Sequence, residues 1–271
     1  FYFYIIMKFI LYLIIFIISI ITYIHVLYHL KKSNEYEVYD IDYINVNHLN
    51  DICNLRQPFT FRATQSSIPI KWESLVKNME LNIIKKSEDK KLIYSEHNHR
   101  IVPHYKNKML FLEKYIKPDF NITCIYDIIF SNDNMTSELT HTYNYRNFYH
   151  VTEGNITIRF FPPDTSSVIE HTTDFETLNE RSNYDIWNNK SNKFVEINAK
   201  ENDIIFIPPY WWYSIKCNEQ SCILVYKYRT FMNNITILPQ LLYSYIAIHN
   251  KKSKITLKKH KKIKKQTINS K

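Results

Sequence analysis

Glycine is almost missing from this chain. Its 271 residues include a single glycine, Gly154, and few alanines, whereas isoleucine, asparagine, lysine, tyrosine and phenylalanine are abundant. These abundant residues have AT-rich codons, so the bias is expected from the coding sequence, and composition alone carries no evidence about function. The length allows one large domain with appendages, enough to bury a substantial core.

Cysteine is also scarce. The four cysteines at positions 53, 124, 217 and 222 include no CxxC pair. Four cysteines in a chain of this length do not make a disulfide framework. The spacing leaves a bridge between Cys217 and Cys222 and free thiols as alternatives, so the redox compartment stays open.

Charged residues are absent from Phe9 to Leu30. This run of 22 residues would span roughly 33 Å as a helix. That length crosses a bilayer, so we expect a transmembrane anchor over residues 1–30. A buried core helix is the alternative, but such helices are usually shorter and have a polar face. A cleaved signal peptide is disfavoured because the run is too long and no small-x-small cleavage site follows it.

Acidic residues are absent from the tail, residues 250–271. Its ten lysines, subtracted from the overall net charge of +9, leave about −1 for the rest of the chain. Clustered lysines bind anionic lipid or nucleic acid by counterion release, and a solvated tail is the alternative. The lysines expected to contact an anionic partner are Lys258, Lys259, Lys261, Lys262, Lys264 and Lys265.

The charges that flank the apolar run bear on its orientation. Lys8 precedes the run, and Lys31 and Lys32 follow it, which favours a cytosolic C-terminal domain. The lysine tail likewise favours a cytosolic or intravirion location. Asn-x-Ser/Thr sequons would suit a lumenal domain instead, although several are expected by chance in a chain so rich in asparagine. They begin at Asn121, Asn134, Asn155, Asn189 and Asn234.

Residues 47–249 have the pattern of one β-rich domain, preceded at 31–46 by an acidic and aromatic linker or edge strand. Asn47 is expected to cap a short helix, and RQPFTFR follows as a strand with Pro58 at its start. From Asn121 onward short strands dominate, which indicates a sandwich or barrel. The strand-rich segments are NITCIYDIIF, KFVEINAK, DIIFIPPYWWYSIK and CILVYKYRTF. ILPQLLYSYIAIHN, which contains Pro239, is expected to form an amphipathic helix that packs on the barrel.

The stretch from His141 to Pro163 holds the one glycine. Aromatic and β-branched residues lie on both sides of Gly154, so it predicts a hairpin turn, where positive φ is often required. Upstream, His97 and His99 are spaced to share one face of a strand and could hold a metal. A surface loop is the alternative that we favour, because no acid lies on that face.

Two stretches carry a recognisable pattern. The first contains His141, the NFY segment from Asn147, Gly154 and FFPP; the second is NDIIFIPPYWWYSI from Asn202. Together they resemble the JmjC and cupin-like branch of the Fe(II)/2-oxoglutarate oxygenases. QPFTFR and a following helix with Trp72 are also similar to the family's first strand and helix. The resemblance covers roughly residues 45–248. It implies a double-stranded β-helix, a cupin-like jelly roll, with flanking α-helices. Where the family has glycine before Asp203, this chain has Asn202, which tolerates the same left-handed turn.

The resemblance also implies a site for Fe(II), held by two histidines and a carboxylate. His141 matches the first histidine, but Tyr143 stands at the carboxylate position and Tyr213 at the second histidine. A phenol is protonated at neutral pH and does not replace either ligand. The metal site is therefore expected to be degenerate, with His141 as a remnant and no Fe(II) bound.

The positions that bind 2-oxoglutarate in the family have changed as well. Asn147 matches a cosubstrate-contacting residue, whereas Ile156 stands at the lysine position and Glu138 at the hydroxyl position. Isoleucine cannot neutralise the cosubstrate's carboxylate, and glutamate would repel it. An alternative in which His150, Glu138 or Glu153 replaces a lost ligand is disfavoured. The odd spacing of His150 and Glu138 from His141 points both to the opposite face of a continuous strand.

Three functional hypotheses follow. We favour a membrane-anchored, cupin-like (JmjC-type) domain that is catalytically inactive, needs no cofactor and acts as a binding or scaffold module. The alternative is an active Fe(II)/2-oxoglutarate-dependent hydroxylase of protein or nucleic acid. The third is a structural membrane protein, of viral origin given the coding bias. The resemblance implies that iron content and succinate release separate the first two.

Overall fold

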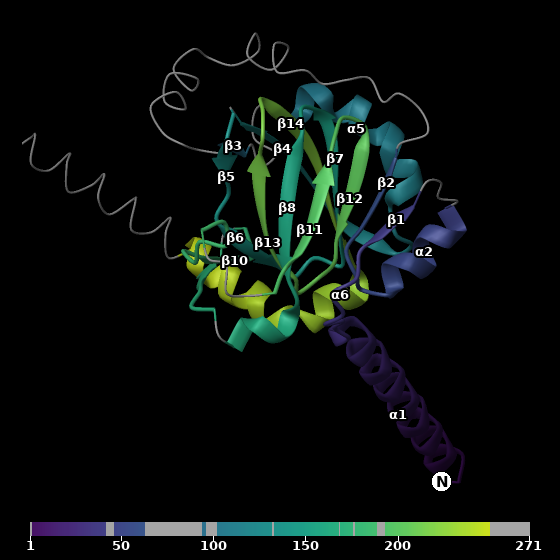
Figure 1. Cartoon of the computed structure of the whole chain (residues 1–271). Helices are drawn as coiled ribbons and strands as arrows, with labels where there is room; N and C mark the ends of the chain where they lie inside the picture. The colour runs from purple at the N-terminus through teal and green to yellow at the C-terminus, as the bar shows by residue number, and fades with distance from the viewer. Residues whose placement is uncertain are drawn as a thin grey trace, which may run out of the picture.

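The computed structural model describes residues 2–41, 46–62, 94–95, 102–131, 133–167, 169–175, 177–188 and 193–249. Over these residues the chain is mostly β, with two sheets rich in antiparallel pairs, flanking helices and an apolar N-terminal helix (Figure 1). This much of the fold class predicted from sequence is confirmed. The helix expected around Trp72, the histidines His97 and His99 and the lysine tail lie outside the described residues.

The first sheet contains the longest strands. Its neighbours pair antiparallel except for β1 and β2, which are parallel. The order is β1 (Tyr39–Ile41), β2 (Phe59–Arg62), β12 (Asp203–Ile207), β7 (Arg146–Glu153), β14 (Ser221–Thr230), β4 (Asn121–Ser131) and β3 (Tyr94–Ser95). The strand predicted after Pro58 is thus confirmed as β2.

The second sheet is antiparallel. It runs in the order β11 (Val195–Ala199), β8 (Ile156–Phe161), β13 (Trp212–Cys217), β6 (Leu139–Thr142), β10 (Asn179–Ser182) and β9 (Thr172–Asp174), and β5 (Met135–Thr136) pairs with β13. The predicted stretch DIIFIPPYWWYSIK is two strands, β12 and β13, in different sheets. The two strands are separated at Pro208 and Pro209. Prolines have no amide hydrogen to donate, so the hydrogen bonding of β12 to its neighbours ends there.

The chain alternates between the two sheets. From β6 to β8, and again from β11 to β14, each strand lies in the sheet opposite to that of the strand before it. Asn202 has a φ of 72° just before β12, as expected for a residue that replaces glycine in a left-handed turn. The alternation places the strand ends, and the loops that join them, at the two ends of the sandwich.

Gly154 does not form the predicted hairpin. β7 pairs with β12 and β14, whereas β8 pairs with β11 and β13, so the turn carries the chain from one sheet to the other. The glycine has a φ of +83°, and a Cβ there would lie 2.4 Å from the carbonyl oxygen of Gln220. The apolar residues on both sides, Val151 and Ile156, face the core between the sheets rather than each other across a hairpin.

Three apolar clusters hold the layers together. The cluster between the sheets includes Tyr149, Ile158, Trp211, Tyr213 and Val225. A second cluster covers the outer face of the first sheet with helices α2 (Val46–Asn54) and α5 (Val102–Ile116). A third, around Trp212, covers the outer face of the second sheet, next to the 3₁₀ helix Pro163–Ser167. The expected helix after residue 46 is confirmed, but it begins at Val46, so Asn47 is not its cap.

Helix α1 (Tyr2–Leu30) projects away from the sandwich (Figure 1). Residues Phe3–Leu30 are long and apolar enough to cross a membrane, and none of the most apolar window is buried in the protein. Its C-terminal end is docked on the domain. Tyr28 donates its hydroxyl to Oδ1 of Asn54 at 2.5 Å, and Nε2 of His29 lies 3.2 Å from the hydroxyl of Thr230.

The C-terminal segment is helical in two parts, α6 (Phe231–Thr236) and residues 238–249, with Pro239 in the first turn of the second part. The prediction that this helix packs on the barrel is correct for one side only. Ser244 is buried, but a set of apolar side chains points outward, each half or more exposed: Leu238, Leu242, Tyr243, Tyr245 and Ile246.

All four cysteines are free, so no bridge joins Cys217 to Cys222.

Candidate functional site

The pairing of β6 with β13 decides which side chains share a face. Trp212 lies opposite His141, and Tyr213 lies opposite Thr140. Because successive side chains in a strand point to opposite faces, His141 shares the outer face of the second sheet with Trp212, and Tyr213 points the other way. His141 and Tyr213, the two histidine positions of the oxygenase pattern, therefore do not converge.

Tyr213 lies in the interior of the sandwich. Its hydroxyl is 2.7 Å from that of Tyr149, and both side chains are almost fully buried. Burial raises the pKa of Tyr213 to about 12 and that of Tyr149 well above its usual value, so both phenols stay neutral at physiological pH. A pair of neutral, mutually bonded hydroxyl groups occupies the position where the resemblance places the second histidine.

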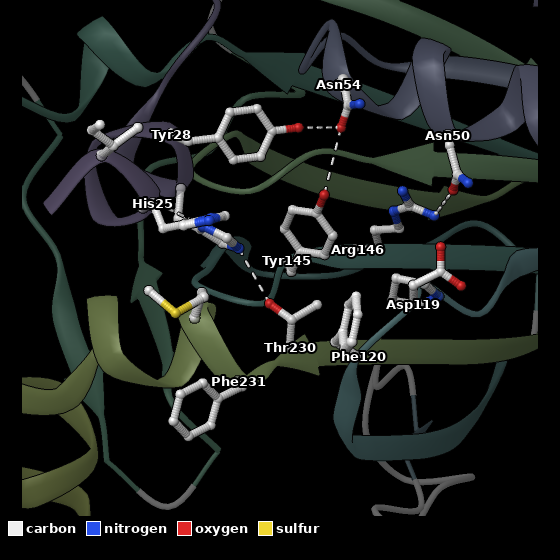
Figure 2. A pocket seen from close by; sticks show the side chains of 14 residues that line it. His25, Tyr28, Asn50, Asn54, Asp119, Phe120, Tyr145, Arg146, Thr230 and Phe231 are labelled. Carbon is white, nitrogen blue, oxygen red and sulfur yellow. Dashed lines mark hydrogen bonds between the residues drawn. The ribbon is translucent and has the colours of Figure 1, made fainter. Parts of the chain in front are cut away.

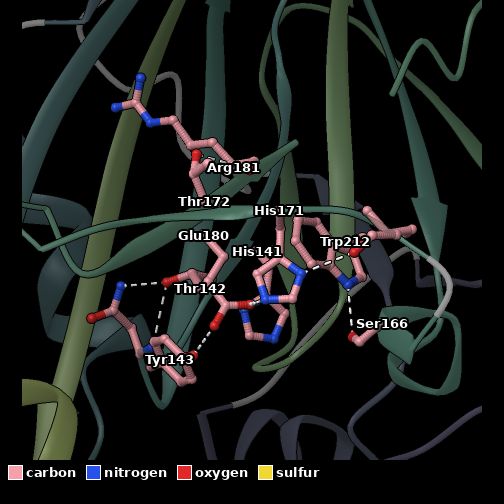
Figure 3. Close-up of polar contacts among 11 residues, drawn as sticks. His141, Thr142, Tyr143, Ser166, His171, Thr172, Glu180, Arg181 and Trp212 are labelled. Carbon is pink, nitrogen blue, oxygen red and sulfur yellow. Dashed lines mark hydrogen bonds and ion pairs between the residues drawn. The ribbon is translucent and has the colours of Figure 1, made fainter. Parts of the chain in front are cut away.

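His141 belongs to a polar cluster centred on Glu180 (Figure 3). β10 pairs with β6 so that Glu180 lies directly opposite His141, and Nδ1 of His141 is 3.4 Å from Oε2 of Glu180. The Tyr143 hydroxyl donates a hydrogen bond to Oε1 of Glu180. Nε2 of His171 is 3.7 Å from Oε2, while its Nδ1 faces the carbonyl of Ile169 at 2.9 Å. Glu180 thus gathers both imidazoles and the phenol around one carboxylate.

The charges in this cluster follow from its burial. Burial, followed by the positive charges of Lys32 and His171, lowers the pKa of His141 to about 3, although a carboxylate lies nearby. Burial and the hydrogen bond to Glu180 raise the pKa of Tyr143 far above its usual value. At neutral pH the His141 imidazole and the Tyr143 phenol are therefore both neutral, and both lie beside Glu180.

Aromatic rings enclose the cluster on one side and solvent reaches it on the other. The Trp212 and Tyr143 rings each lie 5.1 Å from that of His141, and the Trp212 indole donates to the Ser166 hydroxyl at 2.7 Å. On the other side, His171 and Arg181 line an open cavity of about 600 Å³. His171 therefore connects the buried cluster to the surface.

The side chains do not fit the Fe(II) site of the resembled family. Tyr143 is protonated and engaged with Glu180, and Tyr213 faces the opposite side of the sheet. Within the described residues, no group of three or more His, Cys, Asp or Glu side chains is arranged to hold a metal ion. Both histidines instead lie within ion-pair distance of Glu180, whose carboxylate accepts its hydrogen bond from Tyr143.

The expected cosubstrate positions lie apart from each other. Asn147 is buried, donates to the carbonyl of Ile207 at 3.0 Å and accepts from Asn144 at 3.2 Å, so its amide is already engaged. Ile156 is buried in the core between the sheets. Glu138 is more than half exposed and lies 3.4 Å from Arg181. These three side chains are thus engaged in different parts of the fold.

The substitute ligands considered from sequence do not reach His141 either. His150 is in β7 of the first sheet, fully buried, and burial lowers its pKa to about 4. Glu153 ends the same strand, and Glu138 pairs with Arg181. The residues missed from sequence are Glu180 and His171, which lie in HTTDFETLNERS, a polar segment without a recognisable motif. Only the pairing of β10 with β6 brings Glu180 opposite His141.

A comparison with models of known protein families finds no match for the chain, and a comparison with curated proteins finds no relative.

Proposed function

We propose that this chain is a single-pass, membrane-anchored protein whose β domain is a degenerate double-stranded β-helix that serves as a binding or scaffold module. The observation that carries the proposal is the position of the tyrosines. Tyr143 and Tyr213 replace two metal ligands of the resembled oxygenases, and each is hydrogen-bonded to a different partner on a different face of the second sheet.

The strand order supports the cupin-like, JmjC-type assignment. Two facing sheets whose consecutive strands alternate between them are typical of the double-sheet jelly roll. In this arrangement β6, β7 and β8 carry the stretch that resembles the family's first motif, and β12 and β13 carry the second. The motifs are adjacent in space, because β13 pairs with both β6 and β8.

The anchor supports the membrane part of the proposal. None of the most apolar window of α1 is buried, and the helix is long enough for a bilayer, whose hydrocarbon core needs about 20 helical residues. The lysine tail then holds an anionic lipid or nucleic acid close to the membrane, on the cytosolic or intravirion side, by charge rather than by sequence. The domain between anchor and tail is thereby kept at the membrane surface.

The test measures iron and turnover in the detergent-solubilised full chain. We expect incubation with Fe(II) and 2-oxoglutarate to leave only background iron and to release no succinate. His141→Ala is the matched variant, and it should have the same background. Near-stoichiometric iron that is lost in His141→Ala, together with succinate release by the unmodified chain, would contradict the proposal and support the hydroxylase alternative.

A further inference from the structure

A cavity of about 610 Å³ lies where the C-terminal end of α1 meets the β domain (Figure 2). Its walls come from five parts of the chain: the end of α1, helix α2, the segment before β4, the start of β7 and the end of β14. The lining is mostly apolar, with a few polar groups that include Arg146, His25 and Asp119. Apolar walls with a few convergent polar groups are typical of a ligand pocket.

The cavity lies at the expected level of the lipid headgroups. The apolar part of α1, Phe3–Leu30, has 28 residues, whereas a hydrocarbon core takes about 20. With Lys8 at one boundary, the turns that hold Ile24, His25 and Tyr28 reach the other boundary. Tyrosine and histidine are amphipathic side chains suited to that interface.

Positive charge is buried behind the cavity without a matching acid. Arg146 is 4% exposed; it donates to Oδ1 of Asn50 at 2.9 Å, and its Nε has no hydrogen-bond partner. Arg56 is 2% exposed, lies over the rings of Tyr28 and Tyr145, and has an unpartnered Nη2. In the described part of the chain no carboxylate lies within ion-pair distance of either guanidinium.

Such an arrangement favours an anion. Burying a guanidinium without a negative partner costs free energy. A phosphate oxygen can accept hydrogen bonds from the N–H groups that Arg146 leaves free. Asp119 lines the same cavity and is the one acidic group that would oppose an anion there. Arg146 in the lining and Arg56, packed on the lining rings of Tyr28 and Tyr145, outnumber this acid, so the net charge around the cavity stays positive.

The surface around the cavity mouth is apolar and faces the same way as α1. Phe120 is 90% exposed and has a φ of 53°, and Phe231, whose amide donates to the Phe120 carbonyl, is 56% exposed. The outward side chains of residues 238–249 continue this surface along the base of the domain, from which α1 leaves (Figure 1). These exposed apolar side chains thus lie at the end of the domain from which α1 leaves.

From these features we infer that the cavity binds one anionic phospholipid of the bilayer, with its phosphate at Arg146 and an acyl chain along α1 beside Ile24. This inference rests on the proposed membrane anchoring. Charge complementarity and continuity with α1 both point to a lipid rather than a soluble ligand, and a free phosphate would leave the apolar walls uncovered.

The test uses the full chain reconstituted in vesicles of phosphatidylcholine and phosphatidylserine. After detergent extraction at ~1 M salt, where the Debye length is about 3 Å and tail binding is suppressed, retained phosphatidylserine is counted by mass spectrometry. We expect about one molecule per chain, and at least a tenfold loss in Arg146→Gln. Arg62→Gln, at an exposed arginine outside the cavity, should retain the lipid.

A second variant keeps the test decisive if Arg146→Gln does not fold. Met232→Trp fills the cavity without changing a charge, and Ile122→Trp is its control on the exposed base. Lipid retention that is unchanged in Met232→Trp would overturn the inference. So would tight binding of inorganic phosphate that depends on Arg146 in lipid-free detergent, which would identify a soluble anion as the ligand.

Carbonate extraction separates this inference from the proposed function. If the chain resists extraction but retains no phosphatidylserine, the anchor stands and the lipid pocket is wrong. If carbonate releases the chain from the vesicles, membrane anchoring itself is wrong.

Discussion

A side chain at position 154 would collide with neighbouring atoms. The φ of +83° at Gly154 is costly for other residues, and a Cβ would lie 2.4 Å from the Gln220 carbonyl oxygen and 2.5 Å from the Ser221 hydroxyl. We expect Gly154→Ala to lower the free energy of unfolding by at least about 2 kcal/mol. Thermal unfolding of the solubilised chain, followed by near-ultraviolet circular dichroism, measures the loss.

Asn202 provides the control for this prediction. It also has positive φ, at 72°, but it is a residue type that adopts this conformation readily. Asn202→Gly should change the stability by less than about 1 kcal/mol. If Gly154→Ala lost no more stability than Asn202→Gly, the turn at Gly154 would not require glycine.

Buried histidines make the stability of the domain depend on pH. Burial lowers the pKa of His150 to about 4, below the value near 6.5 of an unfolded chain. Between these values the unfolded chain binds a proton that the folded chain does not. The stability that the domain gains from keeping His150 neutral is therefore fully present above pH 6.5. It is lost as the pH falls below 6.5, by about 1.4 kcal/mol per pH unit.

We therefore expect His150 to cost the domain about 2 kcal/mol of stability between pH 6.5 and pH 5. His141, whose pKa is lowered to about 3, adds a parallel loss. In His150→Leu the pH dependence of the unfolding midpoint should fall by about half. The exposed His48 is the control, and His48→Leu should keep the full dependence. An unchanged slope in His150→Leu would contradict a buried, neutral His150.

At the scale of elements, the helix of residues 238–249 has an apolar face that the domain does not cover. We expect this face to lie in the membrane interface, as the base of the domain does in the lipid-binding inference. In Leu242→Trp the added fluorescence should shift to the blue in vesicles, and a quencher placed high on the acyl chain should quench it better than a deep one.

Glu219→Trp is the matched control. Glu219 is exposed and lies two residues before β14, whereas Thr230, at the other end of this strand, contacts α1. A tryptophan at 219 therefore lies at the far end of the sandwich and should not be quenched by lipid-borne groups. Equal quenching at both positions would show that the base of the domain is not the membrane-facing surface.

Element types could be predicted from the sequence more readily than their partners. The β-branched and aromatic runs predict β4, β11 and β14 because such residues fit a half-buried pleated surface. Nothing local distinguishes a hairpin at Gly154 from a crossing between sheets, because both need one residue with positive φ. The choice depends on pairing with β12 and β14, which come much later in the chain.

The candidate site was harder to predict for the same reason. His141, Tyr143 and Tyr213 could be selected by motif spacing, but their faces depend on the register of β6 against β13. Glu180 and His171 have no motif around them. Their proximity to His141 follows only from the pairing of β10 with β6.

At the scale of the whole molecule, the sequons can report on which side of the membrane the domain lies. Asn134 and Asn155 are exposed, so an oligosaccharyltransferase could reach them if the domain were lumenal. We expect neither to be glycosylated in microsomes, and protease added outside should digest the domain. A glycan that is present on the unmodified chain and lost in Asn155→Gln would exclude the cytosolic orientation. A sequon engineered before α1 is the positive control, because its glycosylation shows that the oligosaccharyltransferase is active.

The pairing of β4 with β14 has a consequence for how the protein is made. Asn121 and Thr230 are partners in one ladder, although most of the domain separates them in sequence. Such non-local pairing slows folding, because a long loop must close before the ladder forms. During synthesis, α1 emerges first and can enter the bilayer long before β14 exists. Under the proposed membrane anchoring, the first sheet is therefore completed late, beside a helix already inserted, and the docking of His29 on Thr230 becomes a final step of assembly at the membrane surface.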